Sequence, residues 1–483
     1  MKKIYKLFLL SVVTLGLASC DFDTENYQQI PTDDAYKSVQ DVENGMNGAY
    51  YAAGTYRFLG NYAIAYGDFS AGVSVGNRST GHFYNQSAWI ISDTDAELND
   101  AWNYGFKVID RCTRTIQGAK DVLANTALHL TEEDVAKVKS YMAQCHALKA
   151  LANYYLVNLF AYPYQEGVDN LGLPLVKDTP IKEFEKIDRS TVGQTYELIL
   201  SDLANAETIL DEALADGNIS APNAFYMGAM GIQALKARVA MSMGDYPTAE
   251  VAAKQAIALK GKGNGTGSDK VPSNEIYLSM WSSLAINDED MFTIAKTEAD
   301  NLSANSLNTL YGSYRATIAN STVALFNAED IRLGLIIPQN GGGMTTSKYI
   351  GLPTSAATSN IPVFRKSEMS LIIAEVEARN NNIPEAQNYL YYTAKRDLSI
   401  TSSDQLPATR DELLAFIAQE RIREFAGEGH RFYDARRMGL TIQMTGFKPF
   451  DIAKFVFPIP ADEINAGFCT QQNDNWEKAL PTK

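Results

Sequence analysis

The chain has 483 residues, of which 46% are hydrophobic and 20% charged, and its formal net charge is −15. This length and composition are typical of a folded protein with a large buried core. The acidic balance argues against nucleic acid as a partner, because phosphate binding requires a basic surface.

The N-terminus has the pattern of a bacterial lipoprotein signal peptide. Three lysines precede an apolar run, residues 7–17, that is too short to span a bilayer. The run is followed by Ala-Ser-Cys, an arrangement that resembles a lipobox. We therefore expect removal of residues 1–19 and acylation of Cys20, for example by palmitate. The alternative is an ordinary secretory peptide that ends on a cysteine by chance.

An irregular segment follows the first expected helix. Residues 20–36 are polar and acidic and are predicted to form a tether. Helical spacing then extends from about Ser38 to Tyr51. Residues 54–99 lose this pattern and are rich in glycine, serine, asparagine and aromatic side chains. Because long irregular segments in compact domains usually carry function, this is the first candidate ligand-binding region.

Alanine-rich pairs of amphipathic helices come next and resemble tetratricopeptide units. The expected pairs cover residues 134–160 with 191–215, 223–244 with 246–260, and 369–380 with 384–396. Stacked pairs of this kind bury their faces on one another and form a superhelix. The predicted helical-repeat scaffold therefore extends over about residues 131–260 and 365–440.

A second irregular segment, residues 261–364, separates the second and third pairs. It begins with GKGNGTGSDK, which is rich in glycine but lacks the Gly-Lys-Ser/Thr of a phosphate-binding loop. We predict a loop there. The whole segment is the second candidate ligand-binding region.

The C-terminal stretch at residues 419–440 is predicted to form a helix, a turn from Gly427 to Gly429 and a second short helix. Its many arginines indicate either an anion site or a structural corner held by ion pairs, and the structural corner is favoured. The arginines after the turn are Arg431, Arg436 and Arg437. Two pairs of opposite charge are expected on the solvent side of the first helix, Glu420 with Arg423 and Arg421 with Glu424.

These landmarks together resemble the SusD/RagB family of surface lipoproteins of Bacteroidota. The matching features follow the family order across nearly the whole mature chain. They include the lipobox at Cys20, the helix from Ala147 to Tyr155, the repeat from Ala237 to Ala249, the stretch from Glu420 to Arg437, and Phe457 to Pro460. The resemblance implies a mostly α, SusD-like fold that combines tetratricopeptide-type helical pairs, an α-α superhelix, with large irregular loop insertions. It also implies a single domain over residues 37–483.

The resemblance implies a binding protein of the cell outer membrane and not an enzyme. Such proteins are lipid-anchored, and acids just after the cysteine, here Asp21 and Asp23, resemble the signal for export to the extracellular side. They capture oligosaccharides and deliver them to a SusC-like TonB-dependent barrel, without a cofactor. The alternatives are a peptide-binding relative or, less favoured, a glycoside hydrolase, whose two carboxylates meet only in the fold.

Sugar binding requires exposed aromatic platforms together with polar groups that meet the hydroxyls. Aromatic side chains in irregular segments are therefore better candidates than those at helical spacing. In the first region the expected platforms are Trp89 or Tyr84, with Asp68, Asn77, Arg78 and Asn85 as polar neighbours. In the second region the candidates are Tyr277, Trp281, Tyr311 and Tyr314. The alternative role for Trp89 is to anchor its own loop.

No metal site is expected, because the four histidines lack metal-ligand spacing. The acidic runs from Asp93 to Asp95 and from Asn287 to Asp290 do not complete a calcium-binding loop, and calcium binding stays open. Apart from Cys20, three cysteines remain, and they allow at most one disulfide. No pairing is assigned among Cys112, Cys145 and Cys469.

Overall fold

The structure is a computed structural model that describes residues 35–182, 185–262, 274–352, 355, 357–444, 446–469, 471–474 and 476–482. The expected signal peptide, Cys20 and nearly all of the tether lie outside the described residues, as does most of the glycine-rich stretch that opens the second irregular segment. Among the residues described, no helix is both long enough and apolar enough to cross a membrane.

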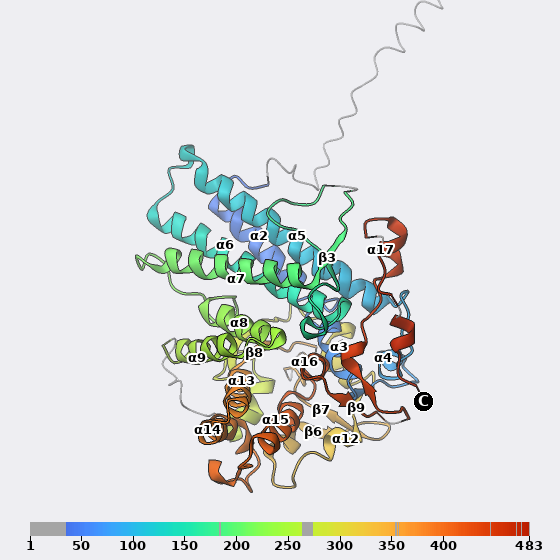
Figure 1. Ribbon diagram of the computed structural model, residues 1–483. Helices are drawn as coiled ribbons and strands as arrows, with labels where there is room; N and C mark the ends of the chain where they lie inside the picture. Colours follow the sequence, from blue (N-terminus) through green and yellow to red (C-terminus); the bar gives the residue numbers. More distant parts are fainter. Residues whose placement is uncertain are drawn as a thin grey trace, which may run out of the picture.

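Four long helices form the upper part of the molecule and lie side by side (Figure 1). They are α2 (Val39–Ala53), α5 (Ala96–Ala124), α6 (Glu132–Phe160) and α7 (Val192–Leu214). Helix α6 begins with a capping box, in which the Thr131 hydroxyl accepts from the Asp134 N–H and the Asp134 carboxylate accepts from the Thr131 N–H. From Ala143 to Phe160 every side chain of α6 is buried, because α5, α7 and α2 all pack against it.

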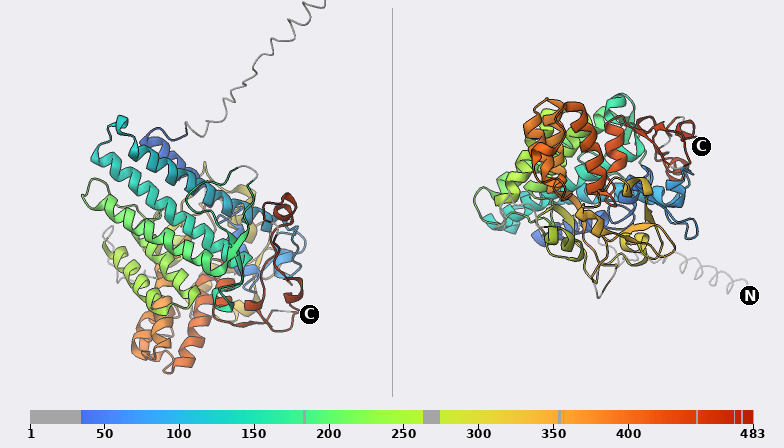
Figure 2. Two further views of the ribbon diagram at one scale, coloured as in Figure 1. Left: turned by 45° about the horizontal axis from the view of Figure 1, so that its top comes forward. Right: turned by 90° about the horizontal axis from the view of Figure 1, so that it is seen from below.

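The remaining helical pairs stack below this group. They are α8 (Ala229–Met243) with α9 (Tyr246–Lys262), α13 (Lys366–Arg379) with α14 (Ile383–Ala394), and α15 (Arg410–Phe425) with α16 (Arg431–Arg437). Figure 2 shows α13 to α15 beside α8 and α9, and α13 packs on α9. Helix α8 begins later than predicted, because the turn before it is held by a hydrogen bond from the Met227 N–H to the Tyr50 hydroxyl at 2.7 Å. The predicted mostly helical architecture is confirmed.

The strands are short. One four-stranded antiparallel sheet has the order β1-β5-β7-β6, built from β1 (Ser74–Val75), β5 (Thr317–Ile318), β7 (Met344–Thr346) and β6 (Ile336–Pro338). Three two-stranded sheets pair β2 (Leu171–Pro174) with β3 (Arg189–Thr191), β4 (Asp290–Ile294) with β8 (Ile361–Arg365), and β9 (Thr441–Ile442) with β10 (Phe450–Asp451). In the four-stranded sheet Ser74 lies opposite Ile318, and Ile318 lies opposite Met344. This sheet therefore joins the two irregular segments to each other.

The irregular segments also contain short helices. These are α3 (Tyr62–Phe69), α4 (Tyr84–Ser87), α10 (Asn274–Ser279), α11 (Leu307–Tyr311) and α12 (Asn320–Val323), with α17 (Ala461–Ala466) near the C-terminus. Single 3-10 turns lie at Thr126–Leu128, Tyr164–Glu166, Met280–Ser282, Ser303–Asn305, Ile331–Leu335, Ser403–Gln405, Ile452–Lys454 and Trp476–Ala479. The three cysteines at 112, 145 and 469 are buried free thiols.

Candidate functional site

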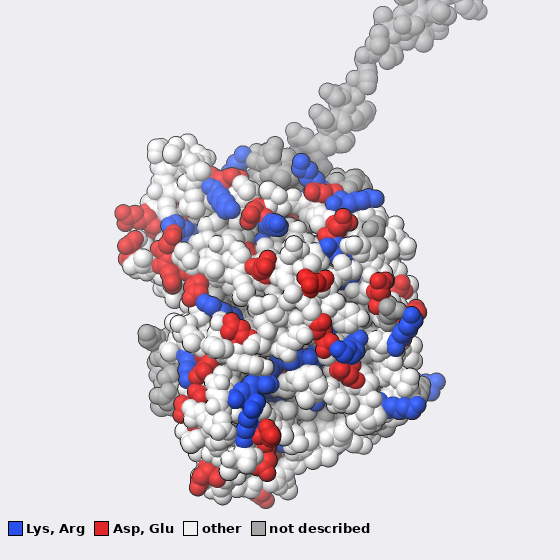
Figure 3. Space-filling model, viewed as in Figure 1, with Lys and Arg blue, Asp and Glu red and all other residues white. Residues whose placement is uncertain are grey.

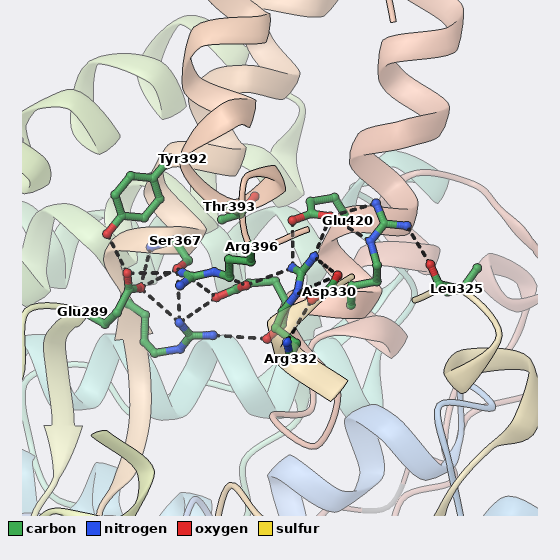
Figure 4. Close-up of polar contacts among 12 residues, drawn as sticks. Glu289, Leu325, Asp330, Arg332, Ser367, Tyr392, Thr393, Arg396 and Glu420 are labelled. Atoms are coloured by element: carbon green, nitrogen blue, oxygen red, sulfur yellow. Dashed lines mark hydrogen bonds and ion pairs between the residues drawn. The ribbon is translucent and has the colours of Figure 1, made fainter. Parts of the chain in front are cut away.

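The C-terminal stretch contributes to a buried cluster of ion pairs, which we call the charge network. Its members are Glu289, Asp330, Arg332, Lys348, Arg365, Arg396, Glu420, Arg423, Glu424 and Glu428. In Figure 4, Arg396 lies between Glu289 and Arg332. Five acidic and five basic side chains are thus paired out of contact with solvent.

The arginines of the charge network bridge carboxylates from distant parts of the chain. The Arg365 guanidinium lies 3.0 Å from a Glu424 oxygen and 2.8 Å from a Glu428 oxygen. The Arg396 Nε lies 2.9 Å from the second Glu424 oxygen, and Arg332 lies 2.8 Å from Glu420. Such bidentate contacts satisfy the fixed fork of the guanidinium group.

The same contacts keep the buried acids ionised. Burial raises the pKa of Glu420, but Arg332 and Arg423 outweigh it and bring the pKa to about 2. Burial likewise opposes ionisation of Glu424, and Arg396, Arg365 and Arg332 hold its pKa well below the usual range. A buried acid held by this many partners is a structural element.

The predicted pairing within the first helix of this stretch is only partly correct. Glu420 does contact Arg423, at 2.8 Å, but both side chains are buried and not on the solvent side. Arg421 contacts Asp434 of α16 at 2.6 Å instead of Glu424. The prediction failed because α16 and the 3-10 turn that carries Arg332 cover this face of α15.

The charge network leaves no room for a nutrient. A small, partly open cavity beside it, lined by Arg421, His430 and Arg437 among others, has a volume of about 20 Å³. That volume holds about one water molecule. The structure therefore supports the structural corner and not an anion site.

An open surface lies around the four-stranded sheet, and we call it the loop face. It consists of residues 76–85, 312–316 and 339–343, all of which are exposed or half-buried except Gly76, Phe83 and Ala316. The His82 ring stacks on the Tyr314 ring, with centroids 3.6 Å apart and planes 10° from parallel. The Thr80 hydroxyl donates to the Tyr314 carbonyl at 2.8 Å. Side chains from two segments more than 200 residues apart thus form one aromatic feature.

Unusual backbone conformations hold the first segment of the loop face. A Cβ atom at Gly76 would lie 2.4 Å from the Phe83 carbonyl carbon, so only glycine permits this close approach. Phe83 itself has a φ of 52° and Trp89 a φ of 54°, both in the left-handed region. Such strain is concentrated at functional sites in proteins, where surrounding structure enforces it.

The second and third segments of the loop face meet at an arginine. Arg315 has a φ of 60°, and one of its guanidinium nitrogens lies 3.6 Å from the position of a Cβ atom at Gly341. The Arg315 and Arg78 side chains are exposed. Neither has a hydrogen bond or an ion pair from its side chain to a residue that the structure describes. Both guanidinium groups are therefore available to a ligand.

Five of the residues predicted as ligand contacts lie on the loop face. Arg78 and Asn85 are exposed, and Asn77, Tyr84 and Tyr314 are half-buried. The Asn77 side-chain Oδ1 accepts from the N–H and the hydroxyl of Ser79 and so fixes the local turn. These residues remain predicted contacts. His82 and Arg315 were missed, because nothing in the local sequence shows that their two segments are brought together by the pairing of β1 with β5.

The structure contradicts the prediction that Trp89 is an exposed platform for a sugar. Its side chain is only 4% exposed, its Nε1 donates to the Met444 sulfur at 3.0 Å, and its ring meets Phe450 and Phe455 edge-on. A ring enclosed in this way has no face for a sugar. The structure fits the alternative role, in which Trp89 anchors its loop to the C-terminal segment.

Tyr277 and Trp281 are also buried, contrary to the prediction. The Arg396 guanidinium lies 3.7 Å from the centroid of the Tyr277 ring. Lys348 and Arg365 lie 4.8 Å and 5.3 Å from the centroid of Trp281. These aromatic faces cover the cations of the charge network and help to exclude water from it.

Tyr311 and Asp68 were also predicted as ligand contacts, but both side chains are buried. The hydroxyls of Tyr311 and Ser74 lie 2.9 Å apart, which ties α11 to β1. Asp68 accepts from the Gly427 N–H at 2.7 Å and so fastens α3 to the turn between α15 and α16. Burial raises the pKa of Asp68 to about 7, even though the N–H groups of Gly429 and Gly427 lower it.

Within the described part of the chain, no group of three or more histidine, cysteine or acidic side chains is arranged to hold a metal ion. In the second acidic run considered for calcium, Glu289 pairs with Arg365 and Arg396, and Asp290 accepts from Thr293. These acids therefore have structural partners.

Two family models match the chain. The model described as the SusD family matches residues 342–448, and a SusD-like model described as starch-binding and associating with the outer membrane matches residues 22–223. The first match contains β7 and the helices α13 to α16. The second contains the long upper helices and the first segment of the loop face.

Similar proteins span almost the full chain. "SusD-like protein P2" of Formosa agariphila is 23% identical over 96% of this chain and 97% of its own. A SusD superfamily structure from Bacteroides thetaiotaomicron is 26% identical, with a TM-score of 0.75 over 90% of this chain and 99% of its own. A putative sugar-binding protein from Bacteroides vulgatus is 22% identical, with a TM-score of 0.80 and coverage of 92% and 99%. A laminarin-binding SusD-like protein is 20% identical, with a TM-score of 0.69 and coverage of 91% and 100%.

Proposed function

The chain belongs to the SusD/RagB family, and from this premise we propose that it binds oligosaccharides at the cell surface through its loop face. In this proposal residues 37–483 act as one ligand-binding domain behind an acylated tether. The family is one of starch- and glycan-binding proteins associated with the outer membrane. The laminarin-binding relative supports a carbohydrate ligand for a chain of this fold.

The observation that carries the proposal is the stack of His82 on Tyr314 on a loop face that also carries the exposed side chains of Arg78 and Arg315. A flat aromatic group matches the apolar face of a pyranose, and guanidinium groups donate hydrogen bonds to its oxygens. The Tyr84 hydroxyl and the Asn85 amide lie on the same face and add further polar groups. This combination is what recognition of a sugar requires.

The loop face supports binding and not hydrolysis. Its three segments, residues 76–85, 312–316 and 339–343, contain no aspartate or glutamate. Glycoside hydrolysis by the usual route needs two carboxyl groups on either side of the scissile bond. We therefore propose a binding role, in keeping with the family. Release of reducing sugar from a bound oligosaccharide by the purified protein would contradict this part of the proposal.

We further propose that Cys20 is acylated and holds the protein on the outer membrane, facing the extracellular side. Delivery of the captured oligosaccharide to a SusC-like TonB-dependent barrel completes the proposed role. The lipobox pattern before Cys20 and the family resemblance support these two points. Affinity purification from native outer membranes is expected to recover a large barrel protein, and recovery of the chain alone would contradict the partnership.

Calorimetry against a panel of oligosaccharides and peptides tests the proposed site. We expect saturable binding of at least one oligosaccharide, weakened by about 1–3 kcal/mol in the Tyr314→Ala variant, by analogy with stacking on other flat ligands. Tyr51→Ala is the matched control, because Tyr51 is 60% exposed on α2. Equal affinity in both variants would move the site away from the loop face, and binding of peptides alone would favour the peptide-binding relative.

A further inference from the structure

Three segments of this acidic chain contain no acidic residue. They are residues 69–92, 301–328 and 331–367. The whole chain has 57 aspartates and glutamates among 483 residues, so segments of this combined length would carry about ten at the average frequency. The three acid-free segments are far apart in sequence, so the fold decides whether they contribute to one surface.

The fold does bring the three segments together. Strand β1 comes from the first segment, β5 from the second, and β6 and β7 from the third. All four strands of the sheet β1-β5-β7-β6 therefore belong to acid-free sequence. The three loops of the loop face lie within the same segments. The loop face is thus built without a single carboxylate side chain.

The basic residues of these segments fall into two groups. Arg332, Lys348, Arg365 and Lys366 are buried, and the first three of them are neutralised within the charge network. Arg78 and Arg315 are exposed on the loop face, and neither forms an ion pair with a described residue. The loop face therefore carries positive charge that no neighbouring acid cancels.

The positive charge of the loop face contrasts with the net charge of −15 of the whole chain. On such a protein a region free of carboxylates repels anions less than the acid-rich parts of the surface do. In Figure 3 acidic side chains are most crowded at the upper left, near the outer end of α7, and are also spread over the middle and right of this face, whereas the area around α12, at the lower right, is largely uncharged. A neutral ligand does not require such a separation.

The hydrogen-bonding groups of the loop face also favour an anionic ligand over a neutral one. Guanidinium groups only donate, and carboxylates, which only accept when ionised, are missing. A neutral oligosaccharide presents many hydroxyl donors, which are best met by carboxylate acceptors. A carboxylated or sulfated sugar presents additional acceptor oxygens, which match a guanidinium fork with two parallel hydrogen bonds.

We propose that the loop face selects anionic oligosaccharides, with Arg78 and Arg315 binding the carboxylate or sulfate groups of the ligand. This inference rests on the proposed function, since it names the class of oligosaccharide bound at that site. The His82–Tyr314 stack then supports the sugar ring while the two arginines discriminate by charge.

Calorimetry with charge-matched pairs tests the proposal. One pair is an oligogalacturonate and its fully methyl-esterified form, and the other is a laminari-oligosaccharide with and without sulfate esters. We expect the charged member of at least one pair to bind about tenfold tighter or more, and its affinity to fall as salt is raised. The pair that responds distinguishes a carboxylate ligand from a sulfate ligand.

Substitutions locate the effect. Arg78→Gln and Arg315→Gln are each expected to weaken binding of the charged member about tenfold, while Arg315→Lys retains part of the preference. Arg410→Gln is the control, because Arg410 is exposed on α15, far from the sheet in sequence, and has no ion pair among the described residues. Circular dichroism verifies that each variant is folded.

Three other results would each overturn a different part of the proposal. Equal or tighter binding of the neutral members would overturn the inference and leave the proposed function standing. A charge preference that survives both glutamine substitutions would overturn the assignment to Arg78 and Arg315. Failure of every oligosaccharide, neutral or charged, to bind would overturn the proposed function as well.

Discussion

The charge network and the loop face are both rich in arginine, yet they use this residue in opposite ways. Three of the four buried guanidinium groups of the charge network meet two or more acidic partners, as Arg365 does with Glu289, Glu424 and Glu428. Arg315 and Arg78 on the loop face meet none among the described residues. The difference teaches that buried, paired arginines maintain this fold, whereas the unpaired arginines of the loop face leave their guanidinium groups open to solvent.

The largest expected effect comes from removing an acid of the charge network. Glu424→Gln leaves Arg332, Arg365 and Arg396 with an uncompensated buried charge, and we expect a loss of about 3–5 kcal/mol in the free energy of unfolding. Denaturant unfolding measures it. Glu197→Gln, at an exposed position on α7, is the control. Equal stability of the two variants would break the contrast between the regions.

A second comparison sets the buried ring of Trp89 against the half-buried ring of Tyr314. Trp89→Ala removes a ring packed on Phe450 and Phe455, and we expect it to lower the free energy of unfolding by about 3–5 kcal/mol. Tyr314→Ala is expected to cost less than about 1 kcal/mol and to act mainly on ligand affinity. Thermal unfolding and calorimetry on both variants separate stability from binding, and the reverse ranking would contradict the assignment of Trp89 to the core.

Asp68 makes the connection between α3 and the charge network sensitive to pH. The pKa of the Asp68 carboxyl group is about 7 in the folded protein, against an ordinary value of 3.8 for aspartate. The folded state therefore binds this proton more tightly. This raised pKa favours folding at low pH, and the benefit is lost as pH rises from about 4 to 7. Asp68→Asn keeps an acceptor for the Gly427 N–H.

We therefore expect Asp68→Asn to reduce the loss of stability between pH 5 and pH 8 by on the order of 2 kcal/mol. Denaturant unfolding of the parent and the variant at both pH values measures the difference. An unchanged difference would show that Asp68 is ionised at little cost in the folded protein.

The smallest expected effect is that of Arg78→Gln on folding. Because Arg78 is exposed and forms no ion pair with a described residue, we expect the free energy of unfolding to stay within about 0.5 kcal/mol of the parent value. The measurement is again denaturant unfolding. A larger loss would show that the loop face uses its arginines for stability, as the charge network does.

The helical scaffold could be predicted from the sequence because its signals are local. The pair α8 and α9 follows from small residues at helical spacing and from Gly244, whose φ of 78° closes the turn. The N-terminus of α6 follows from Thr131 and Asp134, three positions apart. Each of these features is contained within a few turns of chain.

The candidate site could be predicted only to the level of the two irregular segments. Trp89 stands among glycine, serine and asparagine residues, and its burial depends on Met444, 355 positions away. Tyr314 and Thr80 are 234 positions apart and meet only because β1 pairs with β5. Hydrophobic periodicity does not report contacts of this range, so aromatic residues that anchor the loops were mistaken for aromatic residues that bind.

The pairing of β1 with β5 also sets an order of folding. Neighbouring helices such as α8 and α9 form contacts within a few tens of residues, and such contacts form fast. The loop face requires closure of a loop of more than 200 residues, and a further strand, β7, that ends at Thr346. In the nascent chain the helices from α2 to α9 are therefore complete before the loop face can close, whereas α13 to α16 follow β7 and are made after it.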